Sequence, residues 1–406
     1  MITNDAVTLG LLAGTLGVVF WTSRSEHPAF KAFYRVVPVL LLCYFLPAVY
    51  NTIGLVDGER SQLYFVSSRY LLPATLVLLT IATDIPAIIR LGPKALVLFF
   101  TGTVTVIIGG PIAMLIVGLF DPSIISGNVW RGLTAVAGSW IGGAANQAAM
   151  KDVFAIDNDL FGAMVSVDIL VGGVWMAVLL WVAGQSERLD AASGADTTAL
   201  VSLRQRVEQF EREHTRVPAL ADLMMITGVG FALTGLSHAI GNPLAEWIAR
   251  TAPALERYSL TSSFFWVVVL ATTFGLAVSF TPVRRLEGVG ASKVGQVLLY
   301  VLIAAVGMQM DLRAVFTNPG LFLVGGVWLT FHAVIMLLVA KAIRAPMFYL
   351  AVGSEANIGG AASAPVLASA FHPALAPVGV LLAVLGYALG TYGAWLCGQL
   401  MRVVAE

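Results

Sequence analysis

The chain has 406 residues, of which 58% are hydrophobic and only 11% charged. Its mean hydropathy is +0.87. Soluble domains carry about a quarter charged residues, so this composition excludes a water-exposed globule and indicates a protein surrounded by membrane lipid. Lys plus Arg and Asp plus Glu are balanced at 23 each, so no net charge attracts nucleic acid, and no nucleic-acid partner is expected.

The N-terminal run of residues 6–21 has the apolar character of a signal-peptide core. No basic segment precedes it, however, and no Ala-x-Ala-like cleavage site follows it. We therefore expect a retained first helix. Both cysteines, Cys43 and Cys397, fall inside apolar runs, where helix packing is expected rather than a disulfide or a metal site.

Apolar stretches long enough to cross a bilayer recur along the whole chain. A span needs roughly 20 mostly apolar residues, and twelve stretches qualify or nearly do: residues 6–22, 36–56, 63–83, 95–120, 132–150, 158–184, 218–240, 262–281, 294–310, 319–341, 347–370 and 374–401. Only helices and closed barrels span lipid, and these stretches do not alternate polar and apolar residues. The predicted fold class is an all-α polytopic membrane protein.

One segment, residues 185–217, is polar and carries both acidic and basic side chains. Within it, Leu200, Leu203, Val207 and Phe210 recur at helical spacing, which predicts a short surface helix. This segment is expected to be a cytoplasmic linker. It divides the chain into a first half, residues 1–184, and a second half, residues 218–406.

The two halves repeat each other in sequence. Ile-Gly-Gly-Ala-Ala at 141–145 recurs at 358–362, and each copy follows an Ala-Val and a Gly-Ser pair. Upstream, Asp84-Ile-Pro-Ala-Ile-Ile matches Asp311-Leu-Arg-Ala-Val-Phe at the close of a helix. Two matches in the same order favour an internal duplication over a chance recurrence of small residues.

Charge placement indicates how the halves are oriented. If all twelve stretches crossed, the basic loops and the linker with its five Arg could not all be cytoplasmic, as the positive-inside rule requires. The conflict disappears if each of the Gly-rich stretches, 132–150 and 347–370, enters the membrane and leaves it again on the same side. Each half then has about five transmembrane helices plus one broken or re-entrant segment. Because five is odd, the two repeats are inverted, with both termini outside.

The Gly-rich stretches are the predicted binding site. An unwound, Gly-rich backbone exposes N–H and C=O groups that replace an ion's water where they line a protein cavity. Close helix packing through small residues is the alternative, but both copies have polar neighbours that packing does not need. The candidate substrate- and ion-binding residues are Ser139, Gly142, Gly143, Asn146, Gln147, Asp168, Ser354, Glu355, Asn357, Gly359, Gly360 and Ser363.

Two acids stand out because their surroundings are apolar. Asp168 lies inside the apolar helix predicted around 161–182, and Glu355 lies in the second Gly-rich stretch. Burying such an acid costs about 2.5–3.5 kcal/mol on insertion scales, so each either faces a cavity and binds a cation or proton, or is a structural acid. Asp84 and Asp311 sit at helix ends, and their repetition is explained by helix termination alone.

A sodium ion is predicted near Asn146, Glu355 and Asn357. His332 interrupts an apolar helix. It could relay protons, although a packed neutral histidine is the simpler interpretation. The chain has no P-loop, no HExxH pair, no GxSxG elbow and no dinucleotide fingerprint. We therefore expect neither an enzyme nor an ATP-driven pump, and no cofactor beyond a coupling sodium ion or proton.

The sequence resembles a known membrane-protein family. The LLPATLVLL run at 71–79, GSWIGGAANQAAM from Gly138 and GSEANIGGAASAPVLA from Gly353 resemble the domain of unknown function 819 family over nearly the whole chain. More distantly, the paired Gly-Gly motifs are similar to those of glutamate:sodium symporters and 2-hydroxycarboxylate transporters. That resemblance implies an elevator-type mechanism, usually with sodium coupling, and carries over to Gly142, Gly143, Gly359 and Gly360.

The chain departs from the symporter pattern in two ways. Gly-Gly-x-Gly is replaced by Gly-Gly-Ala-Ala in both halves, and neither break contains an Arg that would clamp a substrate carboxylate. The amino-acid or dicarboxylate specificity of those transporters is therefore not transferred to this chain.

Together these features predict a sodium- or proton-coupled secondary transporter of a small polar organic solute in the bacterial inner membrane. An elevator-type core would hold the stretches within 63–184 and 294–401. A scaffold of the stretches within 6–56 and 218–281 would carry a homodimer contact. One alternative is a cation/proton antiporter that uses Asp168 as the exchanging carboxylate. Another is a membrane sensor that binds a solute without moving it.

Overall fold

The computed structural model describes residues 2–34, 37–58, 60–195, 218–310, 319–372 and 375–406. Within these ranges the chain is helical, and the only β-type pairing is an isolated bridge between Ile2 and Val56. The prediction of an all-α fold is confirmed. The predicted surface helix around Leu200 and the repeated Asp311 lie outside the described residues.

The helices of the first half are α1 (Asp5–Ser23), α2 (Pro28–Tyr34), α3 (Val39–Thr52), α4 (Leu63–Val66), the π-helix η1 (Ser67–Leu71), α5 (Leu72–Ile81), α6 (Ile85–Ile89), α7 (Pro93–Phe120), η2 (Pro122–Ile125), α8 (Val129–Val153), α9 (Asn158–Gly184) and α10 (Ser186–Ser193). Those of the second half are α12 (Leu220–Thr251), η3 (Pro253–Tyr258), α13 (Ser263–Ser279), η4 (Pro282–Val289), α14 (Ala291–Gly307), α15 (Gly320–Ala342), α16 (Met347–Ile358), α17 (Gly360–Phe371) and α18 (Ala376–Ala405).

Seven helices of the described chain are long and apolar enough to cross a membrane, and the number rises to nine if each of two bent pairs is one span. The bent pairs are α2 with α3 and α13 with η4. In addition, α14 is apolar but only 17 residues long. The chain is therefore a multi-pass membrane protein.

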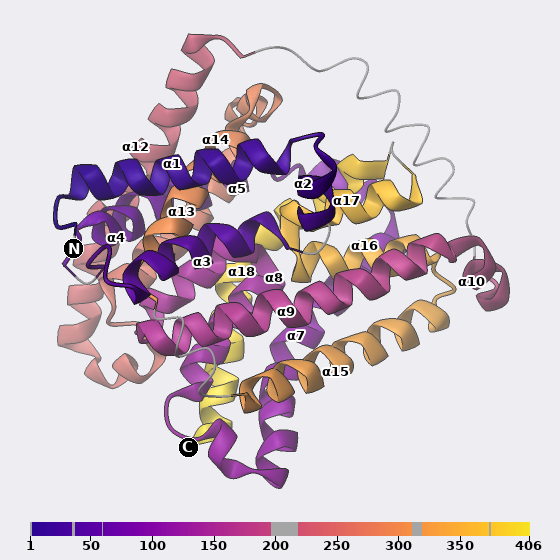
Figure 1. Cartoon of the computed structure of the whole chain (residues 1–406). Helices are drawn as coiled ribbons and strands as arrows, with labels where there is room; N and C mark the ends of the chain where they lie inside the picture. Colours follow the sequence, from indigo (N-terminus) through magenta and orange to yellow (C-terminus); the bar gives the residue numbers. More distant parts are fainter. Residues whose placement is uncertain (1, 35–36, 59, 196–217, 311–318, 373–374) are drawn as a thin grey trace.

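The helices form two groups that are distinguished by their contacts (Figure 1). The inner group consists of α7, α8, α9 and α15 to α18. The outer group consists of α1, α3, α5, α12, α13 and α14, and contacts between the groups are made mainly by α8 and α18. Stretches 63–83 and 294–310 are predicted to belong to the core, whereas in the structure α5 packs against α13 and α14, and α14 packs against α3.

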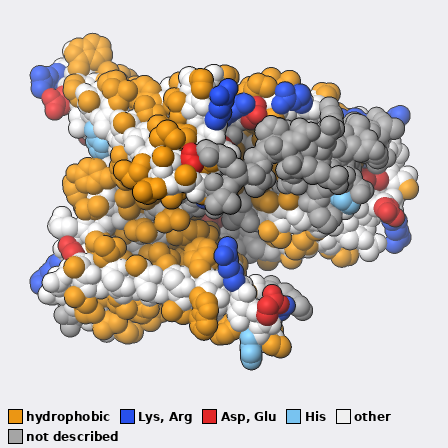
Figure 2. Space-filling view, turned by 90° about the horizontal axis from the view of Figure 1, so that it is seen from above, with side chains coloured by type: hydrophobic (Ala, Val, Ile, Leu, Met, Phe, Trp, Pro, Cys, Tyr) orange, Lys and Arg blue, Asp and Glu red, His pale blue; other side chains and the backbone are white. Residues whose placement is uncertain are grey.

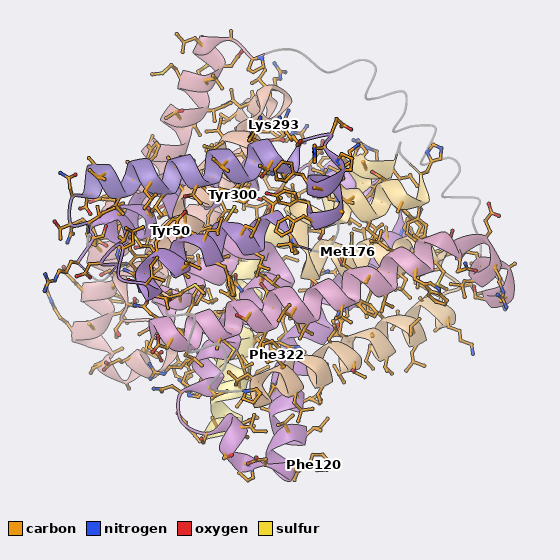
Figure 3. The ribbon with its side chains drawn as sticks, in the orientation of Figure 1. Tyr50, Phe120, Met176, Lys293, Tyr300 and Phe322 are labelled. Atoms are coloured by element: carbon orange, nitrogen blue, oxygen red, sulfur yellow. The ribbon has the colours of Figure 1, made fainter. Side chains whose placement is uncertain are left out.

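Hydrophobic side chains cover most of the described surface in view in Figure 2. Large ones such as Trp21, Trp181 and Trp247 are more than half exposed, as expected for helices whose solvent is lipid. The helix α1 is held on its inner side by side chains below it: the hydroxyl of Tyr50 lies 2.9 Å from Thr15 Oγ1, and the ring of Tyr300 lies 4.7 Å from that of Phe20 (Figure 3).

Polar contacts join the end of α8 to α4 and to the residues that follow α14. Lys151 Nζ donates to Gln309 Oε1 over 3.2 Å and lies 4.1 Å from the centre of the Tyr64 ring. The Tyr64 hydroxyl in turn donates to Asp152 Oδ1 over 2.9 Å. Near the other end of the inner group, Asp84 caps α6 and pairs with Arg284 over 2.7 Å, which accounts for this acid by helix termination and an ion pair.

Candidate functional site

The first Gly-rich stretch is a helical hairpin. Helix α8 is broken at Gly143, whose φ of 74° and ψ of −175° are essentially restricted to glycine. Its two ends lie together, because Arg131 Nη1 donates to the carbonyl oxygen of Phe154 over 3.3 Å and the rings of Trp130 and Phe154 are 5.9 Å apart. The first Gly-rich stretch is therefore a hairpin whose two ends lie side by side.

The second Gly-rich stretch has the same form. Here α16 and α17 are separate helices, and Gly360, the second glycine of the motif, has a φ of 59°. The rings of Phe348, near the start of α16, and Phe371, at the end of α17, have centroids 5.4 Å apart. The same position of the repeated motif therefore breaks the helix in both halves.

The two hairpins open at opposite ends of α9. The first hairpin joins α9 through a short turn, in which the Asp157 carboxylate caps the helix by accepting from the Leu160 N–H. Beyond the other end of α9, Asp190 Oδ1 accepts from the backbone N–H of Met347, the first residue of α16, over 2.8 Å. At 1.5 Å per residue, the 27 residues of α9 separate these ends by about 40 Å.

The breaks of the two hairpins meet inside the molecule. A Cβ atom added to Gly360 would lie only 3.6 Å from the Cα of Gly143. A Cβ on Gly142 would lie 2.7 Å from the Cα of Gly390 in α18, so no side chain fits there. The Tyr387 ring contacts Gly143, and its hydroxyl is hydrogen-bonded to the backbone of Ala361. Sequence reasoning missed Tyr387, although its Gly-rich surroundings in α18 were a usable signal.

Asp168 of α9 lies against the first hairpin. Its Oδ2 accepts from Ser139 Oγ over 2.8 Å and from Gln147 Nε2 over 2.9 Å, and the side chain is buried. Gln147 Oε1 also accepts from the hydroxyl of Tyr44 in α3, over 3.3 Å. This network joins three of the predicted site residues and links the inner group to the outer group.

Glu355 of α16 is placed differently. Its Oε1 accepts from Ser363 Oγ over 2.5 Å, across the break from α17. Its Oε2 is buried and has no hydrogen-bond partner among the described residues. Gly359 leaves room for this arrangement, since a Cβ there would lie 2.1 Å from Glu355 Oε1. Of the two predicted acids, Glu355 is the one with an unsatisfied oxygen.

The two predicted asparagines are held by matching sets of partners. Asn146 Nδ2 donates to the carbonyls of Gly142 and Tyr387, and its Oδ1 accepts from Thr391 Oγ1 over 2.7 Å. Asn357 Nδ2 likewise donates to two carbonyls, those of Gly353 and Phe99, while its Oδ1 accepts from Thr103 Oγ1 over 2.7 Å. Each amide therefore fastens a hairpin to a long neighbouring helix.

Ser354 belongs to a separate buried network. It accepts from Trp175 Nε1 over 2.8 Å and lies 2.7 Å from His332 Nε2, while His332 Nδ1 lies 2.8 Å from Thr105 Oγ1. Thr105 Oγ1 donates to the carbonyls of Thr101 and Gly102. These partners assign the His332 proton to Nδ1, because Ser354 then donates to Nε2 and every group is satisfied. The network fits the neutral histidine of the sequence analysis.

The predicted residues thus form several local networks around the crossing of the hairpins. Asn146, Glu355 and Asn357 have different partners on different helices, and the sodium ion predicted among them stays a prediction. In the part of the chain that the structure describes, no group of three or more His, Cys, Asp or Glu side chains is placed to hold a metal ion.

Fold and site together define an all-helical, multi-pass membrane protein with two opposed Gly-broken hairpins. The family model described as "Protein of unknown function (DUF819)" matches residues 10–404. The chain therefore belongs to this family, as its sequence motifs indicated. No match was found among the curated proteins.

Proposed function

We propose that this protein is a secondary active transporter, which moves a small polar organic solute by alternating access and couples it to sodium ions or protons. One observation carries the proposal: two helical hairpins, opening at opposite ends of α9, meet at Gly143 and Gly360. Broken helices that meet near the middle of the membrane are the recurring plan of such transporters.

The physical basis is the backbone at the breaks. Gly143 and Gly360 interrupt their helices, so N–H and C=O groups and the partial charges of helix ends are available in the interior. Buried hydroxyl, amide and carboxyl groups surround them. Such groups replace the water of a polar solute or an ion, which is the main requirement for carrying either through lipid.

The proposed movement is a displacement of the inner group relative to the outer group. The repeated motif and the opposed hairpins support two inverted repeats, residues 1–184 and 218–406, joined by the linker 185–217. Resemblance to glutamate:sodium symporters and 2-hydroxycarboxylate transporters supports an elevator-type motion. On this proposal the outer group is the scaffold, forms the homodimer contact and remains fixed in the bacterial inner membrane.

Uptake by proteoliposomes tests the proposal. Purified protein is reconstituted, an inward sodium or pH gradient is imposed, and a mixture of amino acids, organic acids and polyols is offered outside. Mass spectrometry of the vesicle contents is expected to show gradient-dependent accumulation of one class. Gly360→Val is expected to abolish it because of the positive φ, whereas Gly173→Val, in open space on α9, is the matched control.

Two outcomes would contradict the proposal. No accumulation under either gradient, with folded protein in the vesicles, would leave a binding or sensing role as the better account. Collapse of an imposed pH gradient on adding sodium, with no solute present, would identify a cation/proton antiporter instead.

A further inference from the structure

The Glu355 carboxyl in the second Gly-rich hairpin is only partly satisfied by the described residues. It is buried, and among the described residues only one of its oxygens has a partner, a neutral hydroxyl 2.5 Å away. An ionised carboxylate in this position would leave half of its charge without a donor, which is costly in a low-dielectric interior. A neutral carboxylic acid leaves only a carbonyl oxygen unpaired.

A bound proton fits the surroundings of Glu355 better than a bound metal cation. Hard cations take about six oxygen ligands. The amide oxygens that would complete such a shell are already engaged, Asn146 Oδ1 by Thr391 and Asn357 Oδ1 by Thr103. A proton needs only the carboxylate itself and one hydrogen-bond partner, and Ser363 supplies that partner.

We infer that Glu355 is the proton-carrying residue of the protein, and that the coupling ion is a proton which binds this carboxylate beside Ser363. The inference rests on the proposed transport function and names its coupling ion. Binding adds one proton to the carboxylate and changes no other bond. Ser363 is partly exposed, whereas Glu355 is 2% exposed, so the hydroxyl is the carboxyl's link to the exterior of the hairpin.

Other titratable groups on the neighbouring helices have partners of their own. Asp168 of α9 accepts from Ser139 and Gln147, His332 of α15 is held by Ser354 and Thr105, and the Tyr387 hydroxyl of α18 is bonded to the Ala361 backbone. The charged residues of α7 and α8, which are Lys94, Arg131, Lys151 and Asp152, lie near the ends of these helices. Arg402 of α18 forms an ion pair with Glu406, and in the described part of the chain no charged side chain is paired with Glu355.

Infrared spectroscopy of the full chain in lipid nanodiscs tests the inference directly. A protonated carboxylic acid has a carbonyl stretch that a carboxylate lacks. At neutral pH we expect such a band in the wild type, its loss in Glu355→Gln and its retention in the matched control Asp168→Asn. Replacing potassium with sodium in the buffer is expected to leave it unchanged.

Two results would overturn the inference: a spectrum unaltered by Glu355→Gln, or a band that sodium abolishes because the metal ion displaces the proton. If Glu355→Gln does not fold, Ser363→Ala is measured instead. This variant removes the hydrogen bond to the Glu355 carboxyl, so the carbonyl stretch is expected to shift. An unshifted stretch would show that the protonated carboxyl is not Glu355. The spectra need no solute and no flux. Failure of the uptake assay alone would therefore overturn the transporter proposal and leave the protonation of Glu355 standing.

Discussion

Asn146 and Asn357 show how single side chains hold the broken helices in place. Each amide nitrogen bonds the carbonyl four residues earlier and a carbonyl of the neighbouring long helix, and each amide oxygen accepts from a threonine on that helix. Asn146 follows its Gly-Gly pair, whereas Asn357 precedes its own. The similar hydrogen bonding of the two asparagines is therefore not a consequence of the sequence repeat. Each amide is satisfied on both sides, as buried polar groups must be.

Removing one of these threonine hydroxyls is expected to weaken the fold. Thr103→Val leaves Asn357 Oδ1 without its donor, which costs about 1–3 kcal/mol for a buried group. Thr101→Val on the same helix is the control, because the exposed Thr101 hydroxyl donates to the carbonyl of Val97 within its own helix. Unfolding by denaturing detergent, compared for the two variants, checks the difference. Equal stabilities would show that the bond to Asn357 contributes little.

Gly143 gives a second prediction at the residue scale. Its φ and ψ lie in a region that side chains with a Cβ rarely adopt, so Gly143→Ala is expected to lower the free energy of unfolding by about 1–3 kcal/mol. Gly173→Ala lies in helical backbone with open space around it and is expected to be neutral or slightly stabilising. Thermal unfolding midpoints of the two variants provide the comparison, and a tolerated Gly143→Ala would argue against the break.

At the scale of elements, hydropathy alone located most of the membrane helices. The predicted stretch 158–184 coincides with α9, and 95–120 differs from α7 by two residues at one end. The two Gly-rich stretches, for which charge placement favours re-entry, are both hairpins in the structure. By contrast, α12 continues to Thr251, beyond the predicted end at 240, because Pro243 lies inside the helix and does not terminate it.

Some members of the candidate site stand out in the sequence, and that they bind a substrate or an ion stays a prediction. The Gly-Gly pairs, Asp168 and Glu355 were recognisable because polar residues and glycines interrupt apolar runs. Contacts between distant segments were not, and these include Tyr387 against Gly143 and Thr391 against Asn146. Such partners are ordinary members of long helices, so only the tertiary fold distinguishes them. For the same reason, hydropathy did not separate α5 and α14 from the inner group.

For the whole molecule, the opposed hairpins predict which surfaces face the same side of the membrane. The variants Ser126→Cys and Ala155→Cys are expected to react with an impermeant thiol reagent from one side of the membrane. The variants Ala192→Cys and Ala342→Cys are expected to react from the other side of the membrane. Background is low because Cys43 and Cys397 are both 0% exposed. Labelling of intact cells and of inverted vesicles checks this, and reaction of all four positions from one side would rule out the opposed arrangement.

The buried network around His332 has a consequence for the leakage of protons through the protein. Its hydrogen bonds run in one direction, from Trp175 through Ser354 and His332 to Thr105, and end on backbone carbonyls that have no proton to pass on. On the inference that Glu355, which follows Ser354 in the sequence, carries a proton, this network offers that proton no continuous path on the side of α15. If the protein is the proton-coupled transporter proposed above, this network limits proton leakage, and an energised membrane would lose little of its gradient through a protein at rest.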